Sequence, residues 1–204
     1  MALDNYLRKR NFAKTPEPQG RVRRGDGRRG FVVQKHKATR LHYDFRLEIP
    51  GVLVSWAVPK GPSINPADKR LAVRTEDHPI EYGNFEGEIP EGQYGAGTVM
   101  VWDRGSYETQ GEGGPAEQLA RGKINVVLNG KKLRGGFTLI RAGKRSGAAK
   151  DSRRWLMMKH RDANSASSWD IENPELDYSV LTGRTLKQIE QGARVEHREK
   201  PSLR

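Results

Sequence analysis

The chain has 204 residues, with 37 Lys or Arg against 25 Asp or Glu, and its formal net charge is +12. It contains no cysteine, which excludes disulfides, zinc ribbons, iron–sulfur clusters and thiol nucleophiles. Mean hydropathy is −0.83, and no apolar run approaches the ~20 residues that cross a bilayer. Met1–Phe12 lacks the apolar core of a secretion signal. We therefore expect a cytoplasmic protein that makes no membrane contact.

The positive charge is concentrated in two segments. Residues 1–30 hold nine Lys or Arg and three acids, a net of +6, and residues 141–161 hold eight and one, a net of +7. The rest of the chain is left with −1. Two local basic patches are typical of proteins that bind a phosphate backbone, and they fit RNA, DNA or an acidic membrane equally. The alternative interpretation is a solubilising tail and a solvated hairpin.

Turn residues divide the chain into short elements. Residues 13–30 combine Pro, Gly and Arg without apolar periodicity, which predicts an extended arm. Eight strand-like runs follow, namely Phe31–Lys35, Leu41–Ile49, Val52–Val58, Leu71–Arg74, Thr98–Trp102, Ile124–Leu128, Phe137–Arg141 and Trp155–Lys159. Pro115–Arg121 and Arg184–Glu190 favour helix. For the second helix, Thr182 is the candidate N-cap and Gly192 the stop.

Many short strands with turns between them predict a mainly β fold. We expect a small closed or partly open β-barrel with a few short flanking helices and an extended N-terminal arm. The predicted division is a basic arm over 1–30, a barrel domain over 31–192, and a charged tail or linker over 193–204.

The strand Leu41–Ile49 alternates without a break between apolar odd positions and polar even positions. Alternate side chains share one face of a strand, about 7 Å apart in successive pairs. His42, Asp44 and Arg46 therefore project side by side, followed by Glu48. The pattern places an imidazole, a carboxylate and a guanidinium in one row.

His36 ends the preceding strand-like run, and a turn through residues 37–40 would fold it back beside His42. Together with Asp44 these residues make a cluster of two imidazoles and one carboxylate, which leaves coordination positions open and suits Mn²⁺, Fe²⁺ or Zn²⁺. Arg46 would then lie where it can hold a phosphate bridged to the metal. The alternative interpretation is a pair of exposed histidines on a hairpin.

Two further segments bear on the chemistry. In Asp77–Tyr82, His78 is placed in a loop as a general acid or a phosphoryl ligand, and Tyr82 as a hydroxyl donor. Taken in isolation, the segment favours the alternative, in which His78 is a turn residue that caps a strand. The Gly-rich segment Pro90–Gly97 does not match the Walker pattern, so we expect it to serve tight backbone turning rather than nucleotide binding.

Several long motifs together resemble the 3′-phosphoesterase domain of bacterial DNA ligase D. They are Phe31–Pro62, Glu76–Tyr82, Gly87–Gly97 and Tyr178–Thr185, and the resemblance runs from about Tyr6 to Gly192. It implies a small β-barrel that trims 3′ ends during non-homologous end joining in a Mn²⁺-dependent reaction. The domain first removes a 3′-terminal ribonucleoside as a phosphodiesterase and then the remaining 3′-phosphate as a phosphomonoesterase.

The resemblance also implies roles for individual residues. It makes His36, His42 and Asp44 the metal ligands and places Arg46, His78 and Tyr82 on the scissile phosphate. It assigns substrate binding to a further group: Gln34, Lys60, Arg70 and Glu76, with Arg10 and Glu17 from the arm. Asn11 stands where family members commonly carry Asp, which predicts a weaker phosphomonoesterase step if that carboxylate takes part.

We therefore expect a metal-dependent DNA 3′-end-processing phosphoesterase that leaves a 3′-OH for repair. Mn²⁺ is the expected cofactor, with other divalent transition metals as alternatives. The expected partners are ribonucleotide- or phosphate-terminated DNA 3′ ends, ligase and polymerase domains, and end-joining proteins at the bacterial nucleoid. One rival is a non-catalytic DNA-binding scaffold module of an end-joining ligase. A second rival is an enzyme that acts on small phosphodiesters or RNA ends.

Overall fold

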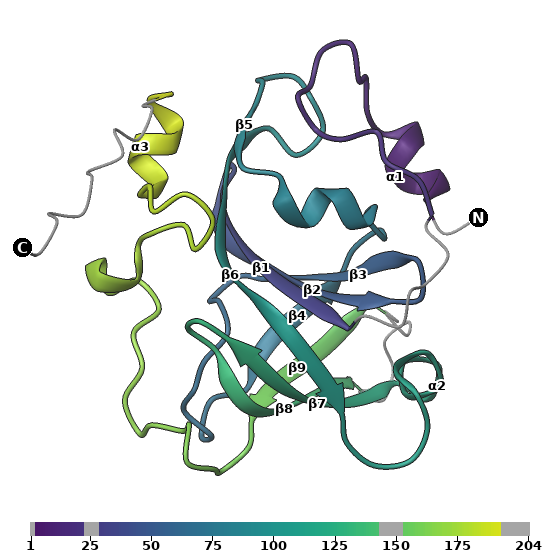
Figure 1. Cartoon of the computed structure of the whole chain (residues 1–204), viewed down its shortest axis with the longest axis vertical. Helices are drawn as coiled ribbons and strands as arrows, with labels where there is room; N and C mark the ends of the chain where they lie inside the picture. The colour runs from purple at the N-terminus through teal and green to yellow at the C-terminus, as the bar shows by residue number, and fades with distance from the viewer. Residues whose placement is uncertain (1–2, 23–28, 143–152, 193–204) are drawn as a thin grey trace, which may run out of the picture.

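The computed structural model describes residues 3–22, 29–142 and 153–192 (Figure 1). Its strands are β1 Gly30–Lys37, β2 Leu41–Ile49, β3 Val52–Val58, β4 Arg70–Arg74, β5 Gly87–Ile89, β6 Gly97–Thr109, β7 Lys123–Gly130, β8 Arg134–Arg141 and β9 Arg154–Lys159. Its helices are α1 Asp4–Arg8, α2 Pro115–Arg121 and α3 Leu186–Glu190, with short 3-10 turns η1 Ile80–Asn84 and η2 Pro174–Leu176. None of the helices in these ranges is long and apolar enough to span a membrane.

The strands form a closed antiparallel barrel. The order is β1-β2-β3-β4-β9-β8-β7-β6, and β6 pairs back onto β1 to close it, while β5 adds a short extension beside the start of β6. Each strand contributes alternate apolar side chains to a core that includes the buried rings of Phe45, Trp56 and Trp155. The predicted mainly β barrel is confirmed, and it is closed rather than partly open.

The N-terminal arm lies against the barrel. Tyr6 of α1 is fully buried, and its hydroxyl donates to the Pro18 carbonyl oxygen at a distance of 2.6 Å. Beyond α1 the arm has no helix or strand through residue 22, as predicted from its composition. In Figure 1 this purple segment lies beside the teal segment that leads into β5, and Tyr6 contacts the His78 ring at 5.2 Å between centroids. The arm therefore covers one side of the barrel.

The predicted elements are present, with corrections at their ends. All eight strand-like runs form strands, and β2, β3 and α2 have the predicted bounds. The N-cap of α3 is Thr185 and not Thr182: the Thr185 side chain accepts the Gln188 N–H, whereas the Thr182 hydroxyl donates to Glu86. The sequence analysis missed α1, β5, η1 and η2, which at three to five residues are too short to show a period. Residues 193–204, predicted as a tail or linker, lie outside the described residues.

Candidate functional site

The first two strands bring the polar row together. In the β1–β2 hairpin His36 is opposite His42, Gln34 is opposite Asp44, and Val32 is opposite Arg46, so these side chains share one face of the sheet. The turn between the strands folds His36 back as predicted. The opposite face carries the apolar residues of β2 into the barrel core.

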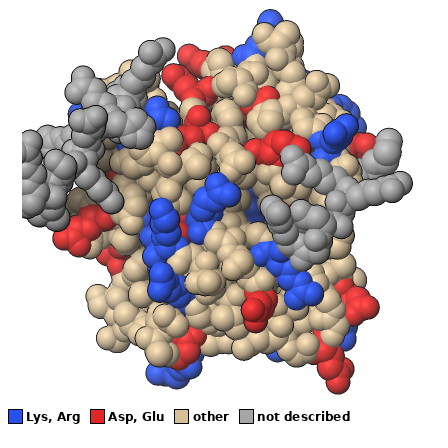
Figure 2. All heavy atoms as spheres, in the orientation of Figure 1, with Lys and Arg blue, Asp and Glu red and all other residues tan. Residues whose placement is uncertain are grey.

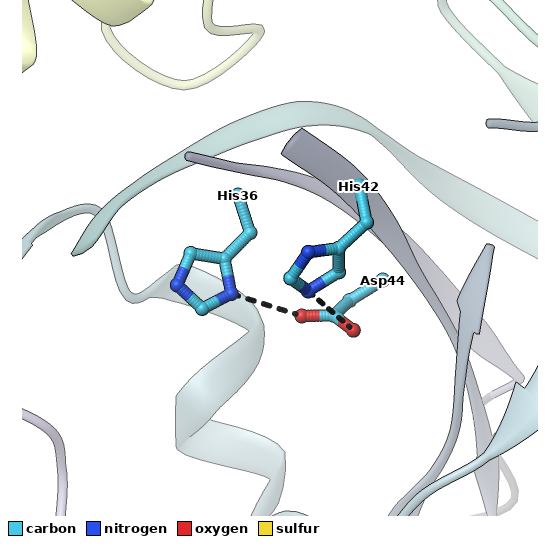
Figure 3. Close-up of side chains that lie close together, drawn as sticks. All are labelled: His36, His42 and Asp44. Atoms are coloured by element: carbon cyan, nitrogen blue, oxygen red, sulfur yellow. Dashed lines mark ion pairs between the residues drawn. The ribbon is translucent and has the colours of Figure 1, made fainter. Parts of the chain in front are cut away.

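His36, His42 and Asp44 form a compact set of ligand atoms, all within 4.8 Å of one another. His36 Nδ1 lies 3.7 Å from Asp44 Oδ2, and His42 Nε2 lies 3.8 Å from Asp44 Oδ1 (Figure 3). Figure 3 shows both imidazoles turning a nitrogen toward the carboxylate. The side chain of His36 is only 8% exposed, which argues against a pair of solvated histidines.

The other nitrogen of each imidazole is held by a backbone carbonyl. His36 Nε2 lies 3.0 Å from the Gly95 oxygen, and His42 Nδ1 lies 2.9 Å from the Arg40 oxygen. A carbonyl only accepts hydrogen bonds, so these nitrogens carry the protons and donate. In the neutral rings that a metal would bind, the nitrogens facing Asp44 carry the lone pairs. Such outer contacts orient imidazoles for metal binding, and the two-nitrogen, one-oxygen donor set fits a divalent transition metal.

Arg46 is the buried centre of the site, with 2% of its side chain exposed. Its Nε donates to Gln34 Oε1 at 2.8 Å, its Nη1 to Ser55 Oγ at 2.8 Å, and its Nη2 to Asp44 Oδ2 at 3.1 Å. Burial alone would raise the pKa of Asp44, but the Arg46 guanidinium and the two imidazoles outweigh it and hold that pKa well below its usual range. Asp44 is therefore an anion available to a cation.

His78 lies between two guanidinium groups. Its Nδ1 is 2.9 Å from Arg46 Nη1, and its Nε2 is 3.3 Å from Arg10 Nη2. Burial, and then the positive charges of Arg46 and Arg10, lower the pKa of His78 well below its ordinary value. At neutral pH the ring is neutral. Beside it the buried ring of Tyr82 lies 4.6 Å away between centroids, and burial raises the pKa of the Tyr82 hydroxyl, which stays protonated.

The arm supplies Arg10. Its Nε donates to Glu17 Oε1 at 2.8 Å, its Nη1 to Glu76 Oε1 at 3.2 Å, and only 4% of its side chain is exposed. Glu17 is itself held by the hydroxyl of Thr15 at 2.9 Å. Two carboxylates thus fix the guanidinium against His78. Asn11, next in the chain, is exposed and accepts the Ala13 N–H.

These groups line one cavity of about 300 Å³. Of the sequence-predicted site residues it is lined by Arg10, His36, His42, Asp44, Arg46, Glu76, His78 and Tyr82. Gln34 and Glu17 are buried one hydrogen bond behind Arg46 and Arg10. Lys60 and Arg70 are not brought to this cavity, because they line a separate pocket with Asp68, to which Arg70 donates at 2.8 Å.

Sequence reasoning missed several residues of the site, among them Ser55, Thr75 and Tyr94. Ser55, which is fully buried, faces Arg46 across the β2–β3 register and lies 3.3 Å from His78 Nδ1. A lone serine inside the apolar run Val52–Val58, in register with a polar row, is the signal that could have found it. Thr75 and Tyr94 also line the cavity, and their loop positions carried no periodic signal.

The two predicted basic segments are only partly within the described residues, since 23–28 and 143–152 lie outside them. Figure 2 shows Lys and Arg side chains gathered near the middle of the visible face and acidic side chains toward its edges. Lys131, which is exposed in the turn between β7 and β8, adds a cation outside both segments, whereas burial lowers the pKa of its neighbour Lys132 to about 7.

Known proteins match this chain over most of its length. Residues 34–141 match the model of a family described as the DNA Ligase D 3′-phosphoesterase domain. The chain is 50% identical over 188 residues to the multifunctional non-homologous end joining protein LigD of Pseudomonas aeruginosa, which covers 90% of this chain and 22% of the relative. It is 42% identical over 173 residues to the LigD DNA repair protein of Mycobacterium tuberculosis, or 84% of this chain and 21% of the relative. The chain thus spans about a fifth of the length of these relatives.

Proposed function

Because the chain belongs to the DNA ligase D 3′-phosphoesterase domain family, we propose that it is a metal-dependent hydrolase that trims DNA 3′ ends. It removes a 3′-terminal ribonucleoside by cleaving the phosphodiester, and then removes the remaining 3′-phosphate to leave a 3′-OH. The observation that carries this proposal is the single cavity in which a three-ligand cluster faces two guanidiniums and an imidazole.

The cluster of three ligands is the proposed metal-binding site. His36, His42 and Asp44 would hold one divalent cation, for which we propose Mn²⁺, and which would act as a Lewis acid and lower the pKa of a bound water. The backbone carbonyls of Gly95 and Arg40, which accept from the outer nitrogens of the two rings, keep both imidazoles in the ligating tautomer. The protein's own part is to hold these atoms before the metal arrives.

Arg46, Arg10 and His78 bind the phosphoryl group. Both guanidiniums are fixed by carboxylate or amide partners, so they stabilise charge developing on the phosphoryl oxygens at little entropic cost. The lowered pKa of His78 argues against the role of general acid, since a second proton is repelled by two cations. Tyr82, whose raised pKa keeps its hydroxyl protonated, adds a further donor.

We assign the polymer contacts to the basic segments and the partners to the end-joining machinery. Cations bind duplex phosphates without reading sequence, so affinity should fall steeply with salt. The relatives are named as multifunctional end-joining proteins of which this chain spans about a fifth, so ligase and polymerase activities are the expected partners, in the cytoplasm at the nucleoid.

A 3′-end assay tests the proposal. A 5′-labelled primer–template that ends in one ribonucleotide is incubated with the protein, with Mn²⁺ or with EDTA, beside a His42→Ala control. We expect metal-dependent shortening, first to a 3′-phosphate and then to a 3′-OH, by the wild type alone. An intact primer that is nevertheless bound in a gel-shift experiment would favour the scaffold alternative.

A further inference from the structure

The rim of the cavity carries one aromatic side chain that the proposed chemistry does not use. Tyr94 lines the cavity and is 48% exposed, whereas Tyr82 in the same cavity is 3% exposed. Ala38, Ile89 and Gly95 also line the cavity, but none of them has a ring. An open tyrosine beside a phosphate-binding interior places a π surface where the rest of a nucleotide would leave the cavity.

The loop Pro90–Gly97 is built to present this ring. The Gln93 N–H donates to the Pro90 oxygen and the Ala96 N–H to the Gln93 oxygen, each at 3.1 Å, which makes two successive turns. Gly95 has φ +80° at the third position of the second turn, as a type II turn requires, and Tyr94 precedes it at the tip. The loop ends at Gly97, where a Cβ would come within 2.2 Å of the Lys37 oxygen, so only glycine allows this close approach to the β1–β2 turn.

Tyr94 is also tied to the site on both sides. The next residue, Gly95, accepts from His36 Nε2 and so orients a metal ligand. From the arm, Lys9 Nζ donates to the Tyr94 hydroxyl at 3.0 Å and lies 4.3 Å from the ring centroid, and the Arg10 guanidinium lies 5.5 Å from it. The ring is thus ordered in advance of a ligand, which lowers the entropic cost of using it as a binding surface.

We propose that Tyr94 is the platform on which a nucleobase next to the scissile phosphate stacks, an inference that rests on the proposed function. With the phosphate held among Arg10, Arg46 and His78, a flanking nucleoside must pass the rim where this ring is exposed. Every nucleobase has a π face, so such a platform accepts any sequence. The base is either that of the departing terminal nucleoside or that of the nucleotide upstream of it.

Three primers distinguish these sources: one that ends in a complete ribonucleotide, one whose terminal ribose lacks a base, and one whose penultimate residue lacks a base. The readout is the ratio of kcat/KM for the complete primer to that for each abasic primer. For the wild type we expect a ratio of roughly ten at the position that stacks, the size of one base–aromatic contact. Tyr94→Phe keeps the ring and should keep this ratio, whereas Tyr94→Ala should reduce it to about one.

Equal processing of all three primers by the wild type would overturn the proposal. An unchanged ratio in Tyr94→Ala, or a ratio lost equally in Tyr94→Phe, would also overturn it, because the ring would then not be the contact.

Binding without turnover separates this inference from the proposed function. Primers with 2-aminopurine at the terminal or the penultimate position are bound in EDTA, and the fluorescence is recorded. Quenching by the wild type and by Tyr94→Phe, but not by Tyr94→Ala, would support stacking even if the wild type hydrolysed nothing. Quenching by all three proteins would contradict it.

Discussion

Replacing one proposed metal ligand should remove the effect of metal on stability while leaving the fold in place. We expect Mn²⁺ to raise the Tm of the wild type and to have little effect on His42→Ala, because the cluster then keeps only two of its three ligands. Thermal unfolding in EDTA and in Mn²⁺ measures this without any substrate. It therefore tests the ligand assignment separately from the activity.

The structure sets the expected magnitudes. A ligand at 100 times its Kd stabilises the folded state by about 2.7 kcal/mol. For a protein of this length each kcal/mol shifts Tm by about 2–4 °C, so the wild type should gain roughly 5–10 °C. In EDTA the substitution itself should cost only about 1 kcal/mol, because the His42 side chain is 23% exposed and makes one hydrogen bond, to the Arg40 oxygen.

His160→Ala is the matched control. His160 is also partly exposed, and its ring lies 2.8 Å from the Thr138 hydroxyl, but it does not line the cavity. It should lose a similar amount of stability in EDTA and keep the full metal response. If His42→Ala were stabilised by Mn²⁺ as much as His160→Ala, the ligand assignment would be refuted.

Four further outcomes are expected. Arg46→Met should cost about 3–5 kcal/mol of unfolding free energy in urea titrations, because the buried partners of the guanidinium lose their hydrogen-bond donor. Arg46→Lys should not recover this stability, since an ammonium lacks the planar fork of the guanidinium. Gly95→Ala and Gly111→Ala should each lose about 1–2 kcal/mol of stability, because both residues have a positive φ, +80° and +84°, and both have space for a Cβ. Only Gly95→Ala should weaken Mn²⁺ binding in titration calorimetry, because the Gly95 oxygen holds His36. The pKa of His78 is well below its ordinary value in the folded protein, so the unfolded chain takes up a proton first, and the free energy of unfolding in EDTA should fall as pH drops below about 6.5. In urea titrations His78→Asn should show a weaker dependence of unfolding free energy on pH. An equal dependence in wild type and variant would contradict the burial argument. Asn11→Asp should speed the removal of a 3′-phosphate. The Tm should not change, because Asp can accept the same Ala13 N–H. An unchanged rate of phosphate release would exclude a role for that carboxylate.

Local sequence was enough to predict that His36, His42 and Asp44 cluster. The alternation of Leu41–Ile49 fixed which side chains share a face, and a short turn left His36 no other neighbour than His42. Both inferences depend on the period of a strand and on hairpin geometry, which act over a few residues. For the same reason the eight strands were found with small errors at their ends.

The environment of the cluster could not be predicted in this way. Asp44 and Arg46 read as one polar face of a strand, yet they are 7% and 2% exposed, because the arm and the segment around η1 cover that face. This cover depends on contacts between distant parts of the chain, such as Arg10 with His78. The resemblance placed Lys60 and Arg70 near the site, whereas the structure places them in another pocket, so a role in substrate binding would require DNA that extends beyond the first cavity.

The closure of the barrel has a consequence for how the protein folds. The β1–β2 hairpin joins neighbours in the chain, but β1 also pairs with β6, with Phe31 opposite Gly105, across more than seventy residues. Such distant pairings must pay for closing a long loop before they gain contacts, and proteins dominated by them refold in milliseconds to seconds. The loop that carries Tyr94 and Gly95 leads directly into β6, so the Gly95 oxygen reaches His36 only when β6 pairs with β1. During refolding, full metal affinity should therefore appear late, together with barrel closure, although all three ligands lie on a hairpin that can form early.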